Sequence, residues 1–261
     1  MLSRNQSKLI TSLRLSKFRQ EEGLFVVEGV KMVGELLASD FAIKTIYATQ
    51  EWISGGHLPP HRYLVEIVEI NDAELEKVSN LTTPNQVLAV AFIKQSKALK
   101  CCDNEWILAL DQIRDPGNMG TIIRTADWFG IQKIVASIGT VDIWNPKVVQ
   151  ASMGSIFRIP VYYTDLNLFL QEAVKHSPVY GTLLDGEPLS SAVFGKQGIL
   201  VIGNESHGIS RQIQSLVSHR ITIPSAIPGE QGRAESLNAS LATGIFCYEI
   251  SRQRQQNKQK L

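Results

Sequence analysis

The chain has 261 residues, of which 44% are hydrophobic and 20% are charged, and its formal net charge is +1. This composition is typical of a globular protein, and the absence of any run of about 18 uncharged apolar residues excludes a membrane-spanning helix. The length allows one or two domains, while the near-neutral charge excludes no class of partner. The opening residues MLSRNQSKLI contain neither an apolar signal core nor a small-residue cleavage site, so we expect a cytoplasmic protein.

Basic residues gather at the two ends of the chain. Residues 1–20 and the segment after Glu249 contain cations and no acid: Arg4, Lys8, Arg14, Lys17 and Arg19 in the first, and Arg252, Arg254, Lys258 and Lys260 in the second. Such clusters could contact a phosphate backbone. Solvated helix faces and a frayed tail explain them equally well on charge alone.

Residues 5–93 alternate between helical and strand-like segments. The pattern predicts a basic helix over 5–20, the strands LFVVEG, IKTIYAT, YLVEIVEI and VLAVAFI, and the helices VKMVGELLAS and DAELEKVS. This alternation indicates an α/β layer domain. The mostly polar stretch KQSKALKCCDNE (94–105) then breaks the pattern. We therefore predict an N-terminal domain over 1–97, a linker over 98–105 and a second domain over 106–261.

Apolar strands recur after residue 106, as WILALD, KIVAS, RIPVYY, VYGTLL, GILVIG and RITIP. The first five are nearly continuous apolar runs, which are typical of parallel strands covered on both faces. A last helix is predicted over 236–252. The second domain is therefore expected to be α/β, with a mostly parallel sheet flanked by helices.

The first unusual loop follows the strand WILALD. Asn118 is the expected N-cap of a helix over 118–129, and Gly130 suits the position after its end. Arg124 would then lie over Gly120, one turn earlier, and point back toward the DPGN loop. A surface ion pair between Arg124 and Asp127 is the structural alternative.

Two further loops follow predicted strands. One presents Asn204 and Glu205 between Gly203 and Gly208, which an ordinary polar turn would also explain. The other is a long Pro- and Gly-rich loop before the last helix, which is expected to place Asn238 in its first turn, with Ser236 as a possible N-cap. Loops at the carboxyl ends of strands are where open α/β sheets bind ligands.

Several familiar sites are absent from the sequence. No G-x-G-x-x-G follows a strand and no phosphate-binding P-loop is present, which argues against a dehydrogenase and a P-loop enzyme. The five histidines have no metal-ligand spacing, so no metal is expected. Cys101, Cys102 and Cys247 form no disulfide framework and no C-x-x-C motif, and we interpret them as structural or incidental thiols.

Taken together, the three loops resemble the three sequence motifs of the SpoU-type (TrmH) RNA ribose methyltransferases of the SPOUT superfamily. The matching residues are Asn118, Gly120, Arg124 and Ala126 in the first motif, Gly203, Glu205 and Gly208 in the second, and Ile223, Pro224, Glu235, Ser236, Leu237 and Asn238 in the third. The resemblance covers about 106–252, although the loop between Pro224 and Glu235 is longer than is usual in the family. The segment KFRQEEGLFVVEGVKMVGELL, with TTPNQVLAV, resembles the small ribosomal-protein-like α/β/α RNA-binding domain that often precedes this catalytic domain.

The resemblance implies a C-terminal trefoil knot, a homodimer, and methyl transfer from S-adenosylmethionine to a ribose 2′-hydroxyl of RNA, most simply ribosomal RNA. It implies catalytic or substrate-positioning roles for Arg124, Asn118, Glu205, Ser236 and Asn238. It also implies cofactor binding by Thr182, Leu183, Gly203, Ile223 and Leu237. Because a guanidinium is not deprotonated in proteins, we expect Arg124 to orient the hydroxyl and stabilise negative charge rather than act as a base.

Two other functions remain open at this point. The substrate could be transfer RNA, with the same chemistry. Alternatively, the chain could be a non-catalytic RNA-binding or ribosome-assembly protein, although the motif residues Asn118, Arg124, Glu205 and Asn238 are all present.

Overall fold

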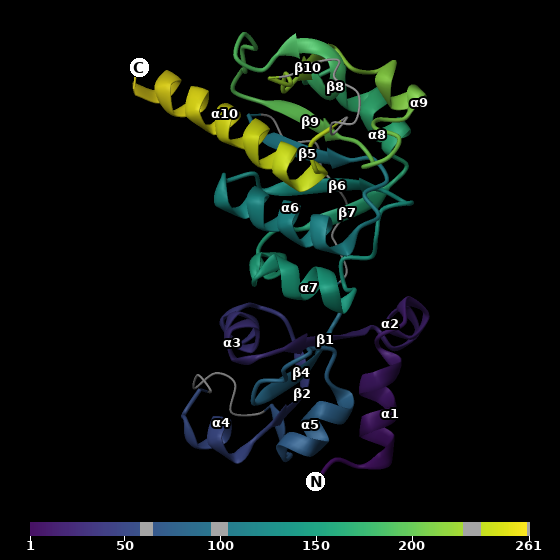
Figure 1. Cartoon of the computed structure of the whole chain (residues 1–261), viewed down its shortest axis with the longest axis vertical. Coiled ribbons are helices and arrows are strands. Elements are labelled where there is room, and N and C mark those ends of the chain that lie inside the picture. Colours follow the sequence, from purple (N-terminus) through teal and green to yellow (C-terminus); the bar gives the residue numbers. More distant parts are fainter. Residues whose placement is uncertain (58–64, 95–103, 227–235, 260–261) are drawn as a thin grey trace. The chain divides into compact units, whose positions relative to one another are not determined.

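The computed structural model describes residues 1–57, 65–94, 104–226 and 236–259 (Figure 1). The chain forms two compact units, one of residues 1–95 with 142–158 and the other of 96–141 with 159–261. Both units contain helices and a sheet, which confirms the predicted α/β class. Most of the predicted linker 98–105, together with Cys101 and Cys102, lies outside the described residues.

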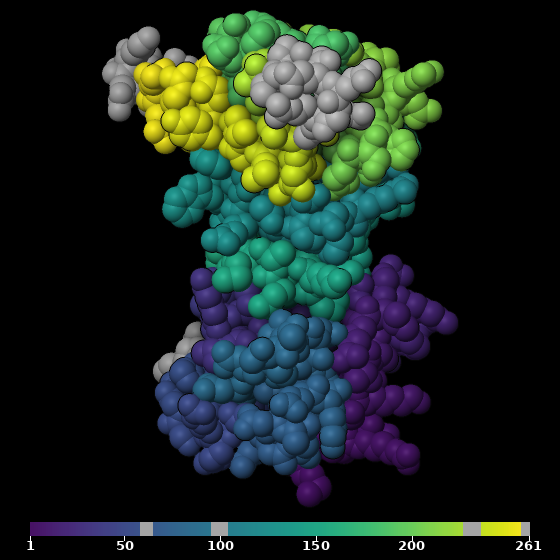
Figure 2. Space-filling model, in the orientation of Figure 1, coloured from purple at the N-terminus to yellow at the C-terminus, as the bar shows by residue number. Residues whose placement is uncertain are grey.

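The first unit is built on a four-stranded sheet in the order β1-β4-β2-β3. β4 runs antiparallel to β1 and β2, and β3 runs parallel to β2. The strands are β1 (Leu24–Glu28), β2 (Ile43–Ala48), β3 (Glu66–Glu69) and β4 (Val87–Phe92). The helices are α1 (Arg4–Ser12), α2 (Ser16–Glu22), α3 (Val30–Ala38), α4 (Gln50–Ser54), α5 (Asp72–Val78) and α7 (Pro146–Ser152), and η2 (Ser155–Phe157) is a 3-10 helix. Side chains of α1 project outward from this unit (purple in Figure 2).

The prediction of one helix over residues 5–20 was wrong, because the chain breaks between α1 and α2. Leu13 is fully buried at the break and packs in the same apolar cluster as Ile10 and Leu75. The Arg19 guanidinium turns back from α2 and donates to the carbonyl oxygens of Leu13 and Arg14, at 2.8 and 2.9 Å. These bonds satisfy carbonyl groups that a continuous helix would have paired internally.

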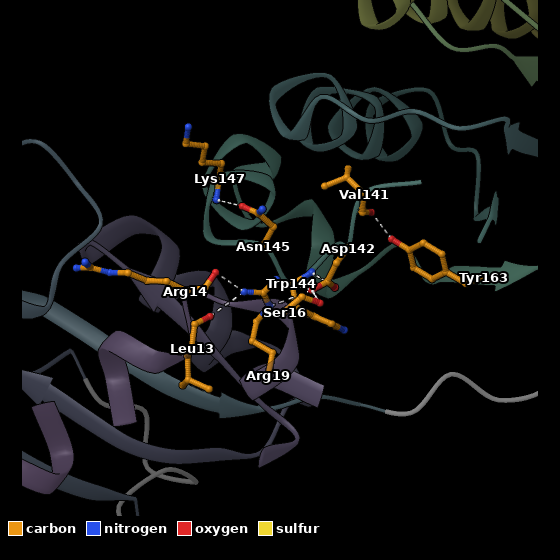
Figure 3. Close-up of polar contacts among 10 residues, drawn as sticks. All are labelled: Leu13, Arg14, Ser16, Arg19, Val141, Asp142, Trp144, Asn145, Lys147 and Tyr163. Atoms are coloured by element: carbon orange, nitrogen blue, oxygen red, sulfur yellow. Dashed lines mark hydrogen bonds and ion pairs between the residues drawn. The ribbon is translucent and has the colours of Figure 1, made fainter. Parts of the chain in front are cut away.

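Residues 142–158 follow β6 (Lys133–Ser137) in the sequence, yet they pack within the first unit. Asp142 accepts two hydrogen bonds from the Arg19 side chain, from Nε at 2.9 Å and from Nη2 at 2.6 Å (Figure 3). The ring of Trp144 lies 4.4 Å from that of Phe25, between centroids. At the other end, Arg158 pairs with Glu35 at 2.6 Å. Ionic and aromatic contacts thus both hold this segment, and the sequence pattern did not predict that it would pack here.

The second unit is built on a six-stranded sheet in the order β10-β8-β9-β5-β6-β7, with every neighbouring pair parallel. This confirms the expected parallel sheet. Its strands are β5 (Trp106–Leu110), β6 (Lys133–Ser137), β7 (Val161–Thr164), β8 (Val179–Pro188), β9 (Gly198–Ile202) and β10 (His219–Thr222). Its helices are α6 (Pro116–Trp128), α8 (Leu166–Ala173), α9 (Arg211–Gln214) and α10 (Ala239–Gln259).

Helices cover both faces of this sheet, which explains the nearly continuous apolar strands. One face packs on α8 and α9 through a buried cluster that includes Ile107, Val135, Leu170, Val201 and Ile213. α6 and α10 lie side by side (Figure 1). Because side chains alternate along a strand, the remaining buried strand residues face the opposite side, where α6 packs against β6.

The trefoil knot remains a prediction, because residues 227–235 of the chain that would be threaded lie outside the described residues. No helix in the described part of the chain is long and apolar enough to cross a membrane.

Candidate active site

The first motif lies at the start of α6. Asp115 is the N-cap, and its Oδ1 accepts from the backbone N–H of Asn118 at 2.7 Å, while Pro116 occupies the first helical turn. The prediction that Asn118 is the N-cap was therefore wrong. Because Asp115 already caps the helix, the Asn118 amide is available for other contacts, and the residue is only 8% exposed.

Asn118 joins the three motifs through its side-chain amide. Its Nδ2 donates to Oε1 of Glu205 at 2.7 Å, and its Oδ1 accepts from Nδ2 of Asn238 at 2.9 Å. These residues are separated by 87 and 120 positions in the chain, so the contacts depend on the tertiary fold. Three of the five predicted catalytic residues thus form one hydrogen-bonded chain at an edge of the second unit.

The loop that carries Glu205 is held in a tight shape after β9. A Cβ on Gly203 would lie 2.3 Å from the backbone of Gly208, so this position excludes any side chain. Asn204 and Gly208 exchange two backbone hydrogen bonds of 3.0 and 2.9 Å, which close the loop. The Asn204 side chain also donates to the carbonyl oxygen of Gln112 at 2.8 Å, and thereby ties the loop to the end of β5. These contacts hold the backbone around Glu205 in this tight shape.

Asp111 is a buried supporting residue that the sequence analysis did not single out. It follows β5 directly, is 4% exposed, and accepts from the backbone N–H of Ser210 through Oδ2 at 2.7 Å. The sequence did contain a signal for Asp111, because in LALD an acidic residue immediately follows a fully apolar strand. Asp111 and Asn204 together hold the first and second motif loops against each other.

The third motif reaches the site at the start of α10. Asn238 precedes the helix, and its Oδ1 accepts from the backbone N–H of Ser240 at 2.9 Å and of Leu241 at 3.3 Å. The prediction of a helix that includes Asn238 in its first turn was wrong, since Asn238 itself caps the helix. Ser236 is exposed and lies before this cap, so it is not the N-cap.

Arg124 lies on the exposed side of α6, two turns after the N-cap. Among the described residues no acid pairs with its guanidinium, Asp127 included, so the surface ion pair considered as an alternative is not formed. The structure does not join Arg124 to the Asn118–Glu205–Asn238 chain by a hydrogen bond. The guanidinium is accessible to an RNA substrate, and its predicted role stays a prediction.

The residues predicted to bind the cofactor come from adjoining parts of the sheet. Thr182 lies on β8, and its hydroxyl donates to the carbonyl oxygen of Val201 on the neighbouring β9 at 3.0 Å. Gly203 follows β9 directly, and Ile223 directly follows β10, which pairs with β8. Leu237, near the end of the third motif and just before α10, is 49% exposed.

These segments could hold a nucleoside. Backbone groups at strand ends can recognise its polar edges, and partly exposed apolar side chains such as Leu183 and Leu237 can cover a base. No cluster of potential metal ligands occurs among the described residues.

Comparison with known proteins shows which family the chain resembles. The model of the SpoU rRNA Methylase family matches residues 105–248, and that of the MRM3-like substrate binding domain matches residues 4–89. The chain is 30% identical to the Bacillus subtilis 23S rRNA (guanosine(2553)-2′-O)-methyltransferase RlmP, over 91% of this chain and 92% of that protein.

Solved structures show the same relationship. A TrmH-family protein from Porphyromonas gingivalis superimposes with a TM-score of 0.84 at 36% identity, over 97% of this chain and 99% of that one. An S-adenosylmethionine-bound rRNA methyltransferase from Sinorhizobium meliloti gives a TM-score of 0.84 at 30% identity, over 97% of each chain. The chain therefore belongs to the SpoU rRNA methylase family of RNA methyltransferases.

Proposed function

We propose that this protein transfers a methyl group from S-adenosylmethionine to a ribose 2′-hydroxyl of ribosomal RNA. The observation that carries the proposal is the bonding of Asn118 to both Glu205 and Asn238, which brings the three family motifs to one place. The names of the relatives support the substrate, since RlmP of Bacillus subtilis is a 23S rRNA 2′-O-methyltransferase. The cofactor is supported by the S-adenosylmethionine-bound relative from Sinorhizobium meliloti.

In this reaction the protein mainly has to align the ribose oxygen with the methyl group, because the methyl donor is already electrophilic. S-adenosylmethionine supplies an electrophilic methyl group on a sulfonium, and the ribose oxygen must lie in line with it at roughly 3–3.5 Å. The backbone at Thr182, Leu183, Gly203 and Ile223 would hold the cofactor, with Leu237 against it. When the new C–O bond forms and the C–S bond breaks, the thioether S-adenosylhomocysteine would leave and the hydroxyl proton would pass to solvent water.

Arg124 is the residue we assign to the ribose and its neighbouring phosphate. A guanidinium stays protonated, so it donates hydrogen bonds to the hydroxyl oxygen and to a phosphate and stabilises developing negative charge. It does not serve as the base. Glu205 is already fixed by Asn118, and we assign it to orienting the ribose. Ser236 and Asn238 complete the polar surroundings.

The active form is proposed to be a homodimer. Leu241, Ile245 and Tyr248 form an exposed apolar stripe along α10, at the spacing of one helix face. Trp128, at the end of the adjacent α6, is 83% exposed, and the ring of its neighbour Phe129 packs edge-on against Tyr248. Such a patch is what a subunit interface would cover. Because Asn118 lies in the first turn of α6 and Asn238 caps α10, this interface would lie beside the site.

A direct experiment tests the function. Purified protein is incubated with methyl-labelled S-adenosylmethionine and either ribosomal or transfer RNA, and the RNA is hydrolysed with alkali. We expect label in alkali-resistant dinucleotides from ribosomal RNA, because a methylated 2′-oxygen cannot attack the adjacent phosphate.

The Arg124→Ala variant tests the assignment of this residue. We expect it to lose transfer while binding S-adenosylmethionine as the unaltered protein does, as measured by calorimetry. Turnover retained in Arg124→Ala would refute the role given to Arg124, and label in transfer RNA alone would correct the substrate.

A further inference from the structure

The cations of the basic N-terminal segment differ in what they contact in the folded protein, and Lys17 forms an exposed pair with Glu21. Arg14 and Arg19 serve the structure, because Arg14 donates to the carbonyl oxygens of Val78 and Ser79, and Arg19 binds Asp142. Arg4 and Lys8 remain exposed, one helical turn apart on α1. Only some of the basic residues at this end of the chain are therefore bound to other groups of the folded protein.

Arg4 and Lys8 line an open groove between α1 and α5. The groove has a volume of about 480 Å³, and its lining is Leu2, Ser3, Arg4, Ser7, Lys8, Thr11, Glu74 and Lys77. α1 packs against α5 here, and both helices belong to the first unit. Arg4, Lys8 and Lys77 form no ion pair with any acid in the described part of the chain.

Glu74 is the acidic residue in this groove, and its carboxylate already accepts hydrogen bonds from backbone N–H groups. Oε1 accepts from the N–H of Leu2 at 2.9 Å, and Oε2 accepts from the N–H of Asn71 at 3.1 Å. These bonds, with a smaller contribution from Lys77, lower the pKa of Glu74, so it stays ionised near neutral pH. The carboxylate thus fastens the start of the chain to α5, and three cations outnumber it along the groove.

We propose that this groove binds the sugar–phosphate backbone of the RNA substrate, with Arg4, Lys8 and Lys77 each contacting a phosphate. Exposed cations without partners release RNA counterions on binding, and contacts of this kind position a nucleic acid without reading its sequence. Hydroxyl groups of Ser3 and Ser7 along the same groove suit ribose and phosphate oxygens. The inference rests on the proposed function and names the surface through which the first unit holds its substrate.

Salt dependence separates phosphate contacts from structural effects. The test variant is Arg4→Ala/Lys8→Ala/Lys77→Ala. The matched control is Lys17→Ala/Lys44→Ala/Lys94→Ala, which removes the same charge from exposed positions of the same unit outside the groove. Binding of each protein to a 23S ribosomal RNA transcript is measured between about 0.05 and 0.2 M salt, and methyl transfer to that transcript is measured alongside.

For the groove variant we expect the slope of log affinity against log salt to become shallower by about 2–3, since each lost phosphate contact removes about one unit. The KM for RNA should rise about tenfold or more, while kcat and S-adenosylmethionine affinity stay unchanged. The control should keep the original slope and KM. Equal shifts in the two variants, or none in either, would overturn the groove assignment while leaving the proposed activity standing.

If the unaltered protein binds the transcript but transfers no methyl group to any RNA, the proposed function fails instead. The salt slopes of the two variants then still decide for or against the groove.

Discussion

Asn118 is the residue through which the site is assembled, and its chemistry explains why. An amide has both a donor and an acceptor, so one side chain can bond the Glu205 carboxylate with Nδ2 and the Asn238 amide with Oδ1. Aspartate could not donate to Glu205, and a hydroxyl would be too short to reach both. Asn118 therefore positions two loops that come from distant parts of the sequence.

Replacing Asn118 by alanine should lower both the stability of the protein and its methyl-transfer activity. Two polar groups at the site lose their partner, which we expect to lower the free energy of unfolding by about 1–3 kcal/mol. Methyl transfer should fall about 100-fold, as displacement of reacting groups by about 1 Å commonly causes. Urea unfolding and the labelled-methyl assay measure the two effects.

Asn167→Ala supplies the matched control for Asn118→Ala. Its backbone N–H bonds Asp165, but its side-chain amide has no partner among the described residues, and we expect both quantities to be almost unchanged. Full activity in Asn118→Ala would show that the hydrogen bonds of Asn118 to Glu205 and Asn238 are not needed for the reaction.

The sequence could identify the motif residues but not their local geometry. The loops after the apolar strands singled out Asn118, Glu205 and Asn238, and the resemblance to the SpoU-type methyltransferases implied that they share one site. The caps predicted for α6 and α10 were both wrong. For α6, Asp115 and Asn118 are both good capping residues, and only the bonds of Asn118 to Glu205 and Asn238 show which of the two caps the helix. Only the structure shows that Arg124 is exposed and that it forms no ion pair with another described residue.

Among the helices and strands, α2 is anchored to its surroundings by one buried cation, Arg19. Arg19 is 2% exposed and satisfies two backbone carbonyl groups and the Asp142 carboxylate at once (Figure 3). Ser16 Oγ donates weakly to the same carboxylate oxygen at 3.4 Å, and Asp142 Oδ1 accepts from the backbone N–H of Trp144 at 3.0 Å. A buried charge with so many partners stabilises the arrangement only while all of them are present.

Arg19→Ala should therefore destabilise the first unit strongly. The carboxylate and two carbonyl groups lose their donor, and we expect a loss of about 3 kcal/mol in the free energy of unfolding. Lys17→Ala is the control in the same helix, since Lys17 forms an exposed pair with Glu21 at 3.8 Å that should contribute less than about 1 kcal/mol. Tryptophan fluorescence in urea follows the transition, because Trp144 packs on Phe25 next to this contact. Equal stability of the two variants would contradict the account of Arg19.

At the scale of the whole molecule, the chain passes between its two units at 95–96, 141–142 and 158–159. Periodicity located the strands and predicted the parallel sheet of the second unit, because hydrophobic spacing is a local property of the sequence. It could not assign residues 142–158 to the first unit, since Arg19, Phe25 and Glu35, which they contact, lie more than a hundred positions earlier. Long-range packing of this kind leaves no periodic signal.

The proposed homodimer gives a prediction at the same scale. Leu241→Glu places a charge on the 63% exposed residue in the apolar stripe of α10, so we expect the dimer to dissociate to a monomer and methyl transfer to fall. Light scattering after size-exclusion chromatography measures the mass. Leu168→Glu is the control, because Leu168 is similarly exposed, at 62%, but lies on α8. A monomeric unaltered protein, or a Leu241→Glu variant that remains dimeric, would refute this interface.

Methyl transfer to ribosomal RNA is tested most directly by a map of ribose 2′-O-methylation in RNA from cells with and without this gene. We predict that one site in ribosomal RNA loses its methyl group when the gene is absent. Methylation there should return with the unaltered gene and not with Arg124→Ala. An unchanged map, together with a purified protein that S-adenosylmethionine does not stabilise against heat, would contradict methyl transfer and leave RNA binding as the function.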